Sequence, residues 1–339
     1  MGKIGLKEIS LFLASVMISV FLAEVLVRSL GLRPFETNIG RHEFDSVLGW
    51  RTRTSHSTYI SRRSFAHHVY YTADGLPCGK HDIERRASRD QPSIALIGDS
   101  FVEGAYLPYE KSLASVLQDI STKQVLNFGV AGYGPDQYLL AARRQLPEFN
   151  VTDIVVFLFP TNDTPYLNSD TYLGYAKPLI SIPEFEPINT PLQEAASNNE
   201  DRGLILGVLD HLALWSLVKP LIRFVAQPDI VLFDAPVQNT RDMRTALRLV
   251  GQIHTEFPEP TFHVYYIPEL SELKNVDVFN HNIELFLKVC YELAINCITP
   301  SALSQDEPEK LYIPIDRHFS ELGARLVANQ IYELLEKQD

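Results

Sequence analysis

A long apolar run near the N-terminus is the first feature of the hydrophobic pattern. Residues 9–27 are nineteen consecutive positions with a single charged side chain, Glu24. As a helix, this length just spans the hydrocarbon core of a bilayer. The sequence therefore predicts a transmembrane helix within an anchor of residues 1–33.

The flanks of this run bear on its processing and its orientation. Phe21 occupies the −3 position before Glu24, where a signal-peptide cleavage site carries a small residue. We therefore expect an uncleaved anchor, with a cleaved signal peptide and a buried N-terminal helix as the alternatives. Basic residues stand on both sides of the run, so charge does not fix the orientation: Lys3, Lys7, Arg28 and Arg33. We expect a single-pass cell-membrane protein whose main domain is extracytoplasmic.

Residues 34–90 have a different pattern. They are mostly polar, with a β-prone stretch at 68–72 and a turn signal at Asp74-Gly75. We expect an irregular lead-in segment that contains a hairpin.

From residue 91 onward, short apolar strands alternate with helical patterns. Strands are expected at 93–98, 124–129, 153–159, 262–268 and 296–299, and helices at 109–120, 135–144, 240–254, 276–293 and 320–336. Continuous apolar strands between helices are typical of a parallel sheet covered on both faces. The sequence therefore predicts an α/β domain over 91–339, with a doubly wound, mainly parallel five-stranded sheet and its site at the carboxyl ends of the strands.

Residues 165–240 interrupt this alternation. Their first part is rich in Pro, Asn and Ser, and a strongly apolar helical stretch follows at 203–224. We expect an inserted helical cap whose apolar face packs on the core, with contact to lipid as the alternative.

Composition narrows the function classes. The chain is 45% hydrophobic and 21% charged, which is ordinary for a folded protein. A formal net charge of −12 repels a phosphate backbone, so we expect no nucleic-acid partner.

Cysteine and histidine positions do not indicate a metal site. We expect Cys78, Cys290 and Cys297 to be buried apolar side chains, with a Cys290–Cys297 disulfide as the alternative. His67 and His68 are adjacent, so on a strand they point to opposite faces. The other histidines without partners at ligand spacing are His211, His254, His263 and His281. We predict no metal and no cofactor.

Ser100 is the first candidate for chemistry. The segment Gly98-Asp99-Ser100 ends the first expected strand, so the hydroxyl lies at the carboxyl edge of the sheet, before a helix N-terminus. Backbone N–H groups there favour an oxyanion. A helix cap is the alternative interpretation of this segment.

Two further loops reach the same edge. The glycine-rich segment 127–134 comes at the end of the second strand, and it lacks the spacing of a phosphate-binding loop. Thr161-Asn162-Asp163 ends the third strand, and the amide of Asn162 can donate to an oxyanion. A simple turn is the alternative for each.

Asp316 and His318 stand just before the C-terminal helix. A carboxylate can orient an imidazole through Nδ1 while Nε2 takes the proton of a serine. A single histidine more often has a structural role, but four elements in this order indicate nucleophilic catalysis by serine.

These motifs, in this chain order, resemble those of the SGNH (GDSL) hydrolase family over about residues 91–336. The resemblance implies a flavodoxin-like α/β/α sandwich. It also implies Ser100 as nucleophile, His318 as base and Asp316 as the group that orients it.

The resemblance also implies an oxyanion hole. Its donors are the backbone N–H of Ser100, that of Gly132 and the side chain of Asn162, with Gly129 as the alternative to Gly132. The chain departs from the family where Pro160 replaces the glycine of G-x-N-D.

A second departure is the spacing D-x-H in place of D-x-x-H. It is similar to the membrane-associated branch of the family and to alginate-type O-acetyltransferases. A backbone carbonyl, in place of Asp316, is the alternative partner of His318.

The expected function is serine-dependent hydrolysis of acetyl or other short-acyl esters on cell-envelope carbohydrate or lipid. The partners are then this substrate and the membrane. An O-acyltransferase to a polysaccharide is one alternative, and a non-catalytic carbohydrate-binding assembly protein is another.

Overall fold

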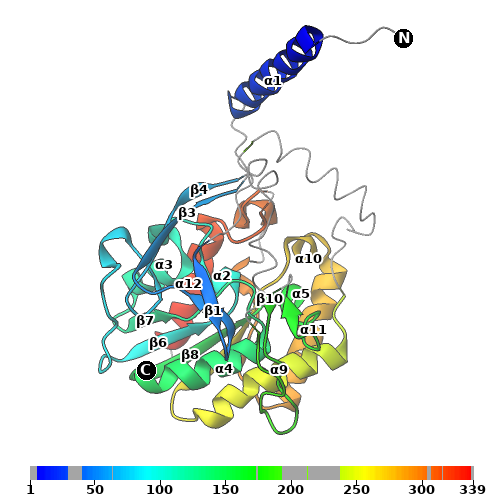
Figure 1. The fold of residues 1–339 in the computed structure, drawn as a ribbon. Coiled ribbons are helices and arrows are strands. Elements are labelled where there is room, and N and C mark those ends of the chain that lie inside the picture. Colours follow the sequence, from blue (N-terminus) through cyan, green and yellow to red (C-terminus); the bar gives the residue numbers. More distant parts are fainter. Residues whose placement is uncertain are drawn as a thin grey trace.

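A parallel five-stranded sheet forms the centre of the protein (Figure 1). The structure, a computed structural model, describes residues 6–29, 40–62, 64–172, 175–192, 212, 237–303, 307–314 and 316–336. The strands are β6 (Ser93–Ile97), β7 (Gln124–Asn127), β8 (Val151–Leu158), β11 (Thr261–Tyr266) and β12 (Cys297–Ile298). Their spatial order is β7-β6-β8-β11-β12, and every pairing is parallel. This is the flavodoxin-like order, so the predicted fold class is confirmed.

Helices cover both faces of this sheet. One layer contains α3 (Leu113–Ile120) and α12 (Glu321–Glu336), and the other contains α4 (Pro135–Gln145), α9 (Thr240–Glu256) and α11 (Val276–Glu292). Side chains of β6 alternate between the two cores: Ile94 and Leu96 enter the first, and Ala95 and Ile97 enter the second. A strand with both faces buried explains the continuous apolar run in the sequence.

The lead-in segment is more regular than expected. It contains the hairpin β1 (His42–Asp45) and β2 (Gly49–Thr52), followed by an antiparallel sheet of β3 (His56–Ser61), β4 (Ala66–Tyr71) and β5 (Pro77–Cys78). Ile60, Val69 and Tyr71 form a small core together with Ala105, whereas Trp50 belongs to the main core on one face of the central sheet.

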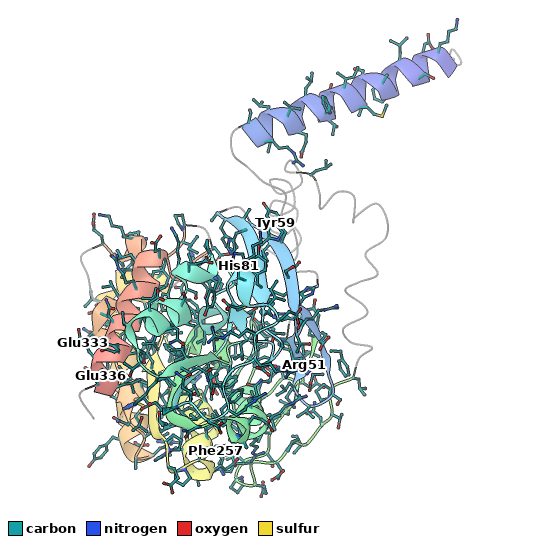
Figure 2. The ribbon with its side chains drawn as sticks, turned by 90° about the vertical axis from the view of Figure 1, so that its left-hand side faces the viewer. Arg51, Tyr59, His81, Phe257, Glu333 and Glu336 are labelled. Atoms are coloured by element: carbon teal, nitrogen blue, oxygen red, sulfur yellow. A yellow bond between two sulfur atoms is a disulfide. The ribbon has the colours of Figure 1, made fainter. Side chains whose placement is uncertain are left out.

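An N-terminal helix, α1 (Leu6–Ser29), coincides with the predicted apolar run. Residues 10–29 have a mean hydropathy of 2.3 and are long and apolar enough to cross a membrane. Large apolar side chains such as Leu11, Phe12 and Phe21 are exposed along it. Figure 2 draws the side chains of this helix. By length and composition alone, the helix fits a membrane anchor and a signal sequence equally.

The predicted cap is described only in part. Its apolar stretch at 203–224 lies outside the described residues, apart from Leu212. The segment before it contains a small antiparallel pair, β9 (Thr171–Tyr172) and β10 (Tyr175–Ala176).

Cys290 and Cys297 form a disulfide, so the expectation that both are free thiols is wrong. The last turn of α11 and the start of β12 bring their Cα atoms to 6.2 Å, within the range that a disulfide needs. Cys78 is free and buried.

The histidines for which no partner at ligand spacing is expected lie in packing or surface positions, where the structure describes them. His254 stacks on Phe262, His263 is buried within β11, and His281 is exposed. His67 contacts the carbonyl of Ala105. His211 lies outside the described residues.

Candidate active site

Ser100 lies at the carboxyl end of β6, where the short helix α2 (Ser100–Glu103) begins. Asp99 caps this helix, because its Oδ1 accepts the N–H of Phe101 at 2.9 Å. The loop after β7 follows the same edge, and the N–H of Val130 donates to the carbonyl of Gly98 at 3.1 Å. The serine hydroxyl is therefore fixed at a helix N-terminus, with the glycine loop beside it.

A chain of two hydrogen bonds joins the serine to a histidine and a carboxylate. The Oγ of Ser100 lies 2.8 Å from Nε2 of His318, and Nδ1 of His318 lies 2.5 Å from Oδ1 of Asp316. Burial favours the neutral acid of Asp316. However, the hydrogen bond to His318 and the positive charge of Arg62 outweigh burial and lower the pKa of this carboxyl. A carboxylate at Nδ1 leaves Nε2 free to accept the serine proton.

The turn that carries Asp316 and His318 has an unusual backbone. Arg317, between them, has a φ of 67°, in the left-handed region that non-glycine residues rarely adopt. The N–H of Ile313 donates to the carbonyl of His318 at 2.7 Å, and the guanidinium of Arg317 lies 2.9 Å from Glu269. This conformation lets a carboxylate only two residues away face the imidazole, which accounts for the D-x-H spacing.

Two aromatic rings enclose the imidazole. Tyr106 stacks on His318 with ring centroids 3.8 Å apart, and Phe101 contacts it with centroids at 4.7 Å. The hydroxyl of Tyr106 donates to the carbonyl of Ser100. Sequence reasoning missed Tyr106, because a single tyrosine in a loop carries no motif.

The candidate oxyanion donors differ in their availability. Gly132 has a φ of +81°, and a Cβ there would lie 2.7 Å from Tyr172, so only glycine fits. Neither its N–H nor that of Ser100 has a hydrogen-bond acceptor among the described residues. The N–H of Gly129 already donates to Oδ1 of Asn127 at 2.9 Å, which removes Gly129 as the alternative donor.

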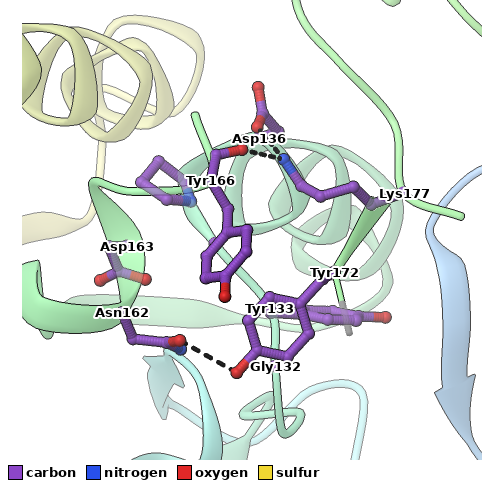
Figure 3. Close-up of a pocket in the computed structure, with 10 residues that line it drawn as sticks. Gly132, Tyr133, Asp136, Asn162, Asp163, Tyr166, Tyr172 and Lys177 are labelled. Atoms are coloured by element: carbon purple, nitrogen blue, oxygen red, sulfur yellow. Dashed lines mark hydrogen bonds and ion pairs between the residues drawn. The ribbon is translucent and has the colours of Figure 1, made fainter. Parts of the chain in front are cut away.

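Asn162 lies in the single-turn helix α5 (Pro160–Asp163). Pro160 takes the first helical position, where the ring fits and no N–H is needed, so its replacement of glycine leaves the turn intact. The hydroxyl of Tyr172 donates to Oδ1 of Asn162 at 3.0 Å (Figure 3), and Nδ2 of Asn162 donates to Asp99 at 3.0 Å. An amide NH₂ carries two protons, so one remains for a ligand.

Asp163, the neighbour of Asn162, has a structural position. It is buried and accepts the hydroxyl of Tyr138 at 2.8 Å and the N–H of Phe159 at 2.7 Å. Burial and the nearby Asp99 carboxyl raise the pKa of Asp163 well above its usual range. These bonds fix the start of α5, and with it the position of Asn162.

A small pocket lies next to two of the candidate donors. Gly132 and Asn162 form part of its wall, together with Tyr166, Tyr172 and Lys177 (Figure 3). The ammonium of Lys177 is buried and lies 2.7 Å from the buried Asp136. A group bound at the donors therefore has this pocket as its neighbour, and sequence reasoning did not identify Lys177, Asp136 or Tyr166.

The fold and this geometry define an α/β protein with a Ser–His–Asp hydrogen-bond chain at the carboxyl edge of a parallel sheet. Solved structures similar to it include the lipase/acylhydrolase from Enterococcus faecalis, which is 13% identical with a TM-score of 0.43. That match covers 73% of this chain and 96% of that one.

Two further similar structures are as distant. A member of the lipolytic protein G-D-S-L family from Veillonella parvula is 15% identical with a TM-score of 0.39, over 71% of this chain and 97% of that one. The psychrotrophic esterase EstA from Pseudoalteromonas is 13% identical with a TM-score of 0.40, over 73% of this chain and 97% of that one. No family model and no curated protein match the sequence. Similarities this distant do not define the activity of this chain.

Proposed function

We propose that this protein is a serine esterase in which Ser100 is the nucleophile, His318 the general base and Asp316 the residue that orients the base. The observation that carries this proposal is the continuous chain Ser100–His318–Asp316, with separations of 2.8 and 2.5 Å. A helix cap by Ser100 would not need an imidazole at hydrogen-bond distance from its hydroxyl.

The reaction has two steps. The Oγ of Ser100 attacks the ester carbonyl while Nε2 of His318 takes its proton, and a tetrahedral oxyanion forms. The C–O bond to the leaving alcohol then breaks, His318 returns the proton to that alcohol, and an acyl-serine remains. Water, deprotonated by His318, attacks the acyl carbonyl carbon. The bond from this carbon to Oγ of Ser100 then breaks, His318 returns the proton to Oγ, and the carboxylic acid is released.

Three donors stabilise the oxyanion in this proposal: the N–H groups of Ser100 and Gly132 and the second amide proton of Asn162. Each well-placed donor contributes roughly 3 kcal/mol to transition-state stabilisation. Tyr172 and Asp99 hold the amide of Asn162 in one orientation, so little reorganisation accompanies the reaction.

The proposed substrates are acetyl or other short-acyl esters on cell-envelope carbohydrate or lipid. The apolar helix α1 supports a location at the membrane. Transfer to a sugar hydroxyl would use the same acyl-serine, with the sugar in place of water.

A chromogenic acetate ester tests this proposal. We expect the full chain in detergent micelles to hydrolyse it, and Ser100→Ala to lower kcat by on the order of 10⁴- to 10⁶-fold, because no other hydroxyl replaces the nucleophile. Equal rates for the two proteins would exclude Ser100 as the nucleophile. With a candidate glycan present, acetylated sugar in place of free acetate would identify a transferase.

A further inference from the structure

The peptide bond between Ala131 and Gly132 is fixed by a side chain from the lead-in segment. The indole Nε1–H of Trp50, in β2, donates to the carbonyl oxygen of Ala131 at 3.0 Å. These residues are 81 positions apart in the sequence. The contact therefore joins the N-terminal hairpin directly to the loop that carries a proposed oxyanion donor.

This contact sets the direction of one N–H group. The carbonyl of Ala131 and the N–H of Gly132 belong to the same peptide unit, which is planar and trans. In such a unit the C=O and the N–H point in opposite directions. A donor that holds the Ala131 oxygen from one side therefore aims the Gly132 N–H toward the other side. A hydrogen bond to the oxygen also polarises the unit and strengthens its N–H as a donor.

The indole itself is held firmly. Trp50 is 6% exposed, stacks on Tyr172 with centroids 6.2 Å apart, and packs edge-on against Tyr133 at 5.7 Å. The hydroxyl of Tyr133 donates to the backbone carbonyl of Trp50. An indole with this packing cannot rotate away without disrupting several contacts. Its N–H therefore keeps one position relative to the loop that carries Ala131 and Gly132.

The preceding peptide unit, which contains the N–H of Ala131, is also held by a side chain. The N–H of Ala131 donates to Oε2 of Glu103 at 2.7 Å, and Glu103 belongs to α2, the same short helix that begins with Ser100. Tyr71 donates to the other oxygen of Glu103 at 2.6 Å, and Arg41 lies 3.5 Å from it. The loop is thus clamped between the nucleophile's own helix and the lead-in segment.

We propose that Trp50 is a positioning residue for the reaction, because its indole N–H fixes the peptide unit whose Gly132 N–H stabilises the oxyanion. This inference rests on the proposed esterase function. Trp50 touches neither the serine nor the histidine in the described contacts. Its N–H acts through the Ala131–Gly132 peptide unit, whereas its ring also packs on Tyr172, which holds Asn162, so a variant that keeps the ring isolates the role of the N–H.

Replacing the indole N–H without removing the ring tests this role. In Trp50→Phe, and in a chain with benzothienylalanine at position 50, which substitutes sulfur for the indole N–H in a ring of nearly the same shape, the donor is lost. We expect kcat for the chromogenic acetate ester to fall about 10- to 100-fold, with KM changed by less than about threefold. The rate of covalent reaction with a phosphonate should fall by the same factor, because its tetrahedral oxygen uses the same donors.

Tyr265→Phe is the matched control. Tyr265 is fully buried and donates to Gln330 at 3.1 Å in the opposite core, so its variant loses a buried aromatic donor remote from the site. Its kcat and its phosphonate reactivity should equal those of the wild type. If both position-50 variants retain kcat, or if Tyr265→Phe loses as much, the positioning role of Trp50 is refuted.

The same experiment separates this inference from the proposed function. Hydrolysis that depends on Ser100 but not on the indole N–H would refute the role of Trp50 alone. Hydrolysis that does not depend on Ser100 would refute both.

Discussion

The lead-in segment and the α/β domain make different contributions to the candidate site. All the groups proposed to react or to bind the oxyanion come from the α/β domain, at the ends of β6, β7 and β8 and before α12. The lead-in segment contributes groups that hold these loops: Trp50 at Ala131, and Tyr71 and Arg41 at Glu103. Residues before the α/β domain thus hold the loops of the candidate site in place, although none of them is proposed to contact the substrate.

The turn of the hairpin β3–β4 also supports the segment that carries the proposed base. The hydroxyl of Ser64 donates to the carbonyl of Pro314, just before Asp316. Phe65 packs edge-on against Tyr106, the ring that stacks on His318. The lead-in segment therefore supports the turn of the proposed base as well as the loop of the oxyanion donor.

The largest effects should come from the α/β side of this comparison. His318→Ala should lower kcat by on the order of 10⁴- to 10⁶-fold, and Asp316→Asn by about 10²- to 10⁴-fold, because the second variant keeps the base but weakens its orientation. Steady-state hydrolysis of the chromogenic ester checks both. An Asp316→Asn protein as active as the wild type would show that the carboxylate does not orient His318.

A smaller effect, on stability, is expected at Glu103, where the α/β domain contacts the lead-in segment. Burial alone would raise the pKa of Glu103, but Arg41, His42 and the hydroxyl of Tyr71 outweigh it and hold that pKa far below its usual value of 4.5. Glu103→Gln should lower the free energy of unfolding by about 3–5 kcal/mol at neutral pH, because it leaves the buried charge of Arg41 without its partner.

The pH dependence of this loss follows from the sign of the shift. A carboxyl whose pKa is lowered by folding contributes stability that is complete above its unfolded pKa and is lost as the pH falls toward its folded pKa. The difference between wild type and Glu103→Gln should therefore be full above about pH 4.5 and shrink below it. Denaturant unfolding at several pH values measures it. Glu256→Gln removes one partner of a pair with Arg143 whose side chains are 25–26% exposed, and it should cost less than about 1 kcal/mol. An equal loss in both variants would contradict the account.

The disulfide should have the smallest effect on the site. Cys290 and Cys297 are seven residues apart, at the sheet edge formed by β12. Replacing both with alanine should lower the free energy of unfolding by about 2 kcal/mol, since the cross-linked loop is short. Esterase activity should not change, and a fall in kcat comparable to that of Trp50→Phe would show that the site depends on more than its immediate supports.

The sequence pattern predicted the sheet, because strands buried on both faces leave continuous apolar runs such as 94–97 and 154–158. It also predicted that separate motifs would share one edge, since parallel strands end on the same side. Ser100 and His318, which are 218 positions apart, indeed lie at hydrogen-bond distance.

The supporting contacts of the site, the backbone of Arg317 and the disulfide could not be predicted from the sequence. Trp50 and Glu103 form hydrogen bonds with backbone groups of Ala131, and a backbone acceptor or donor has no signature in a sequence. The left-handed Arg317 explains the short D-x-H spacing, yet arginine gives no sign of that conformation. The pairing of Cys290 with Cys297 depends on where α11 ends relative to β12, which spacing alone does not specify.

Covalent labelling tests the central claim most directly. After the full chain reacts with a fluorophosphonate, mass spectrometry of its peptides should locate one adduct, on Ser100, and His318→Ala should form it far more slowly. An adduct on another residue, or hydrolysis that continues unchanged once Ser100 is fully labelled, would contradict the account.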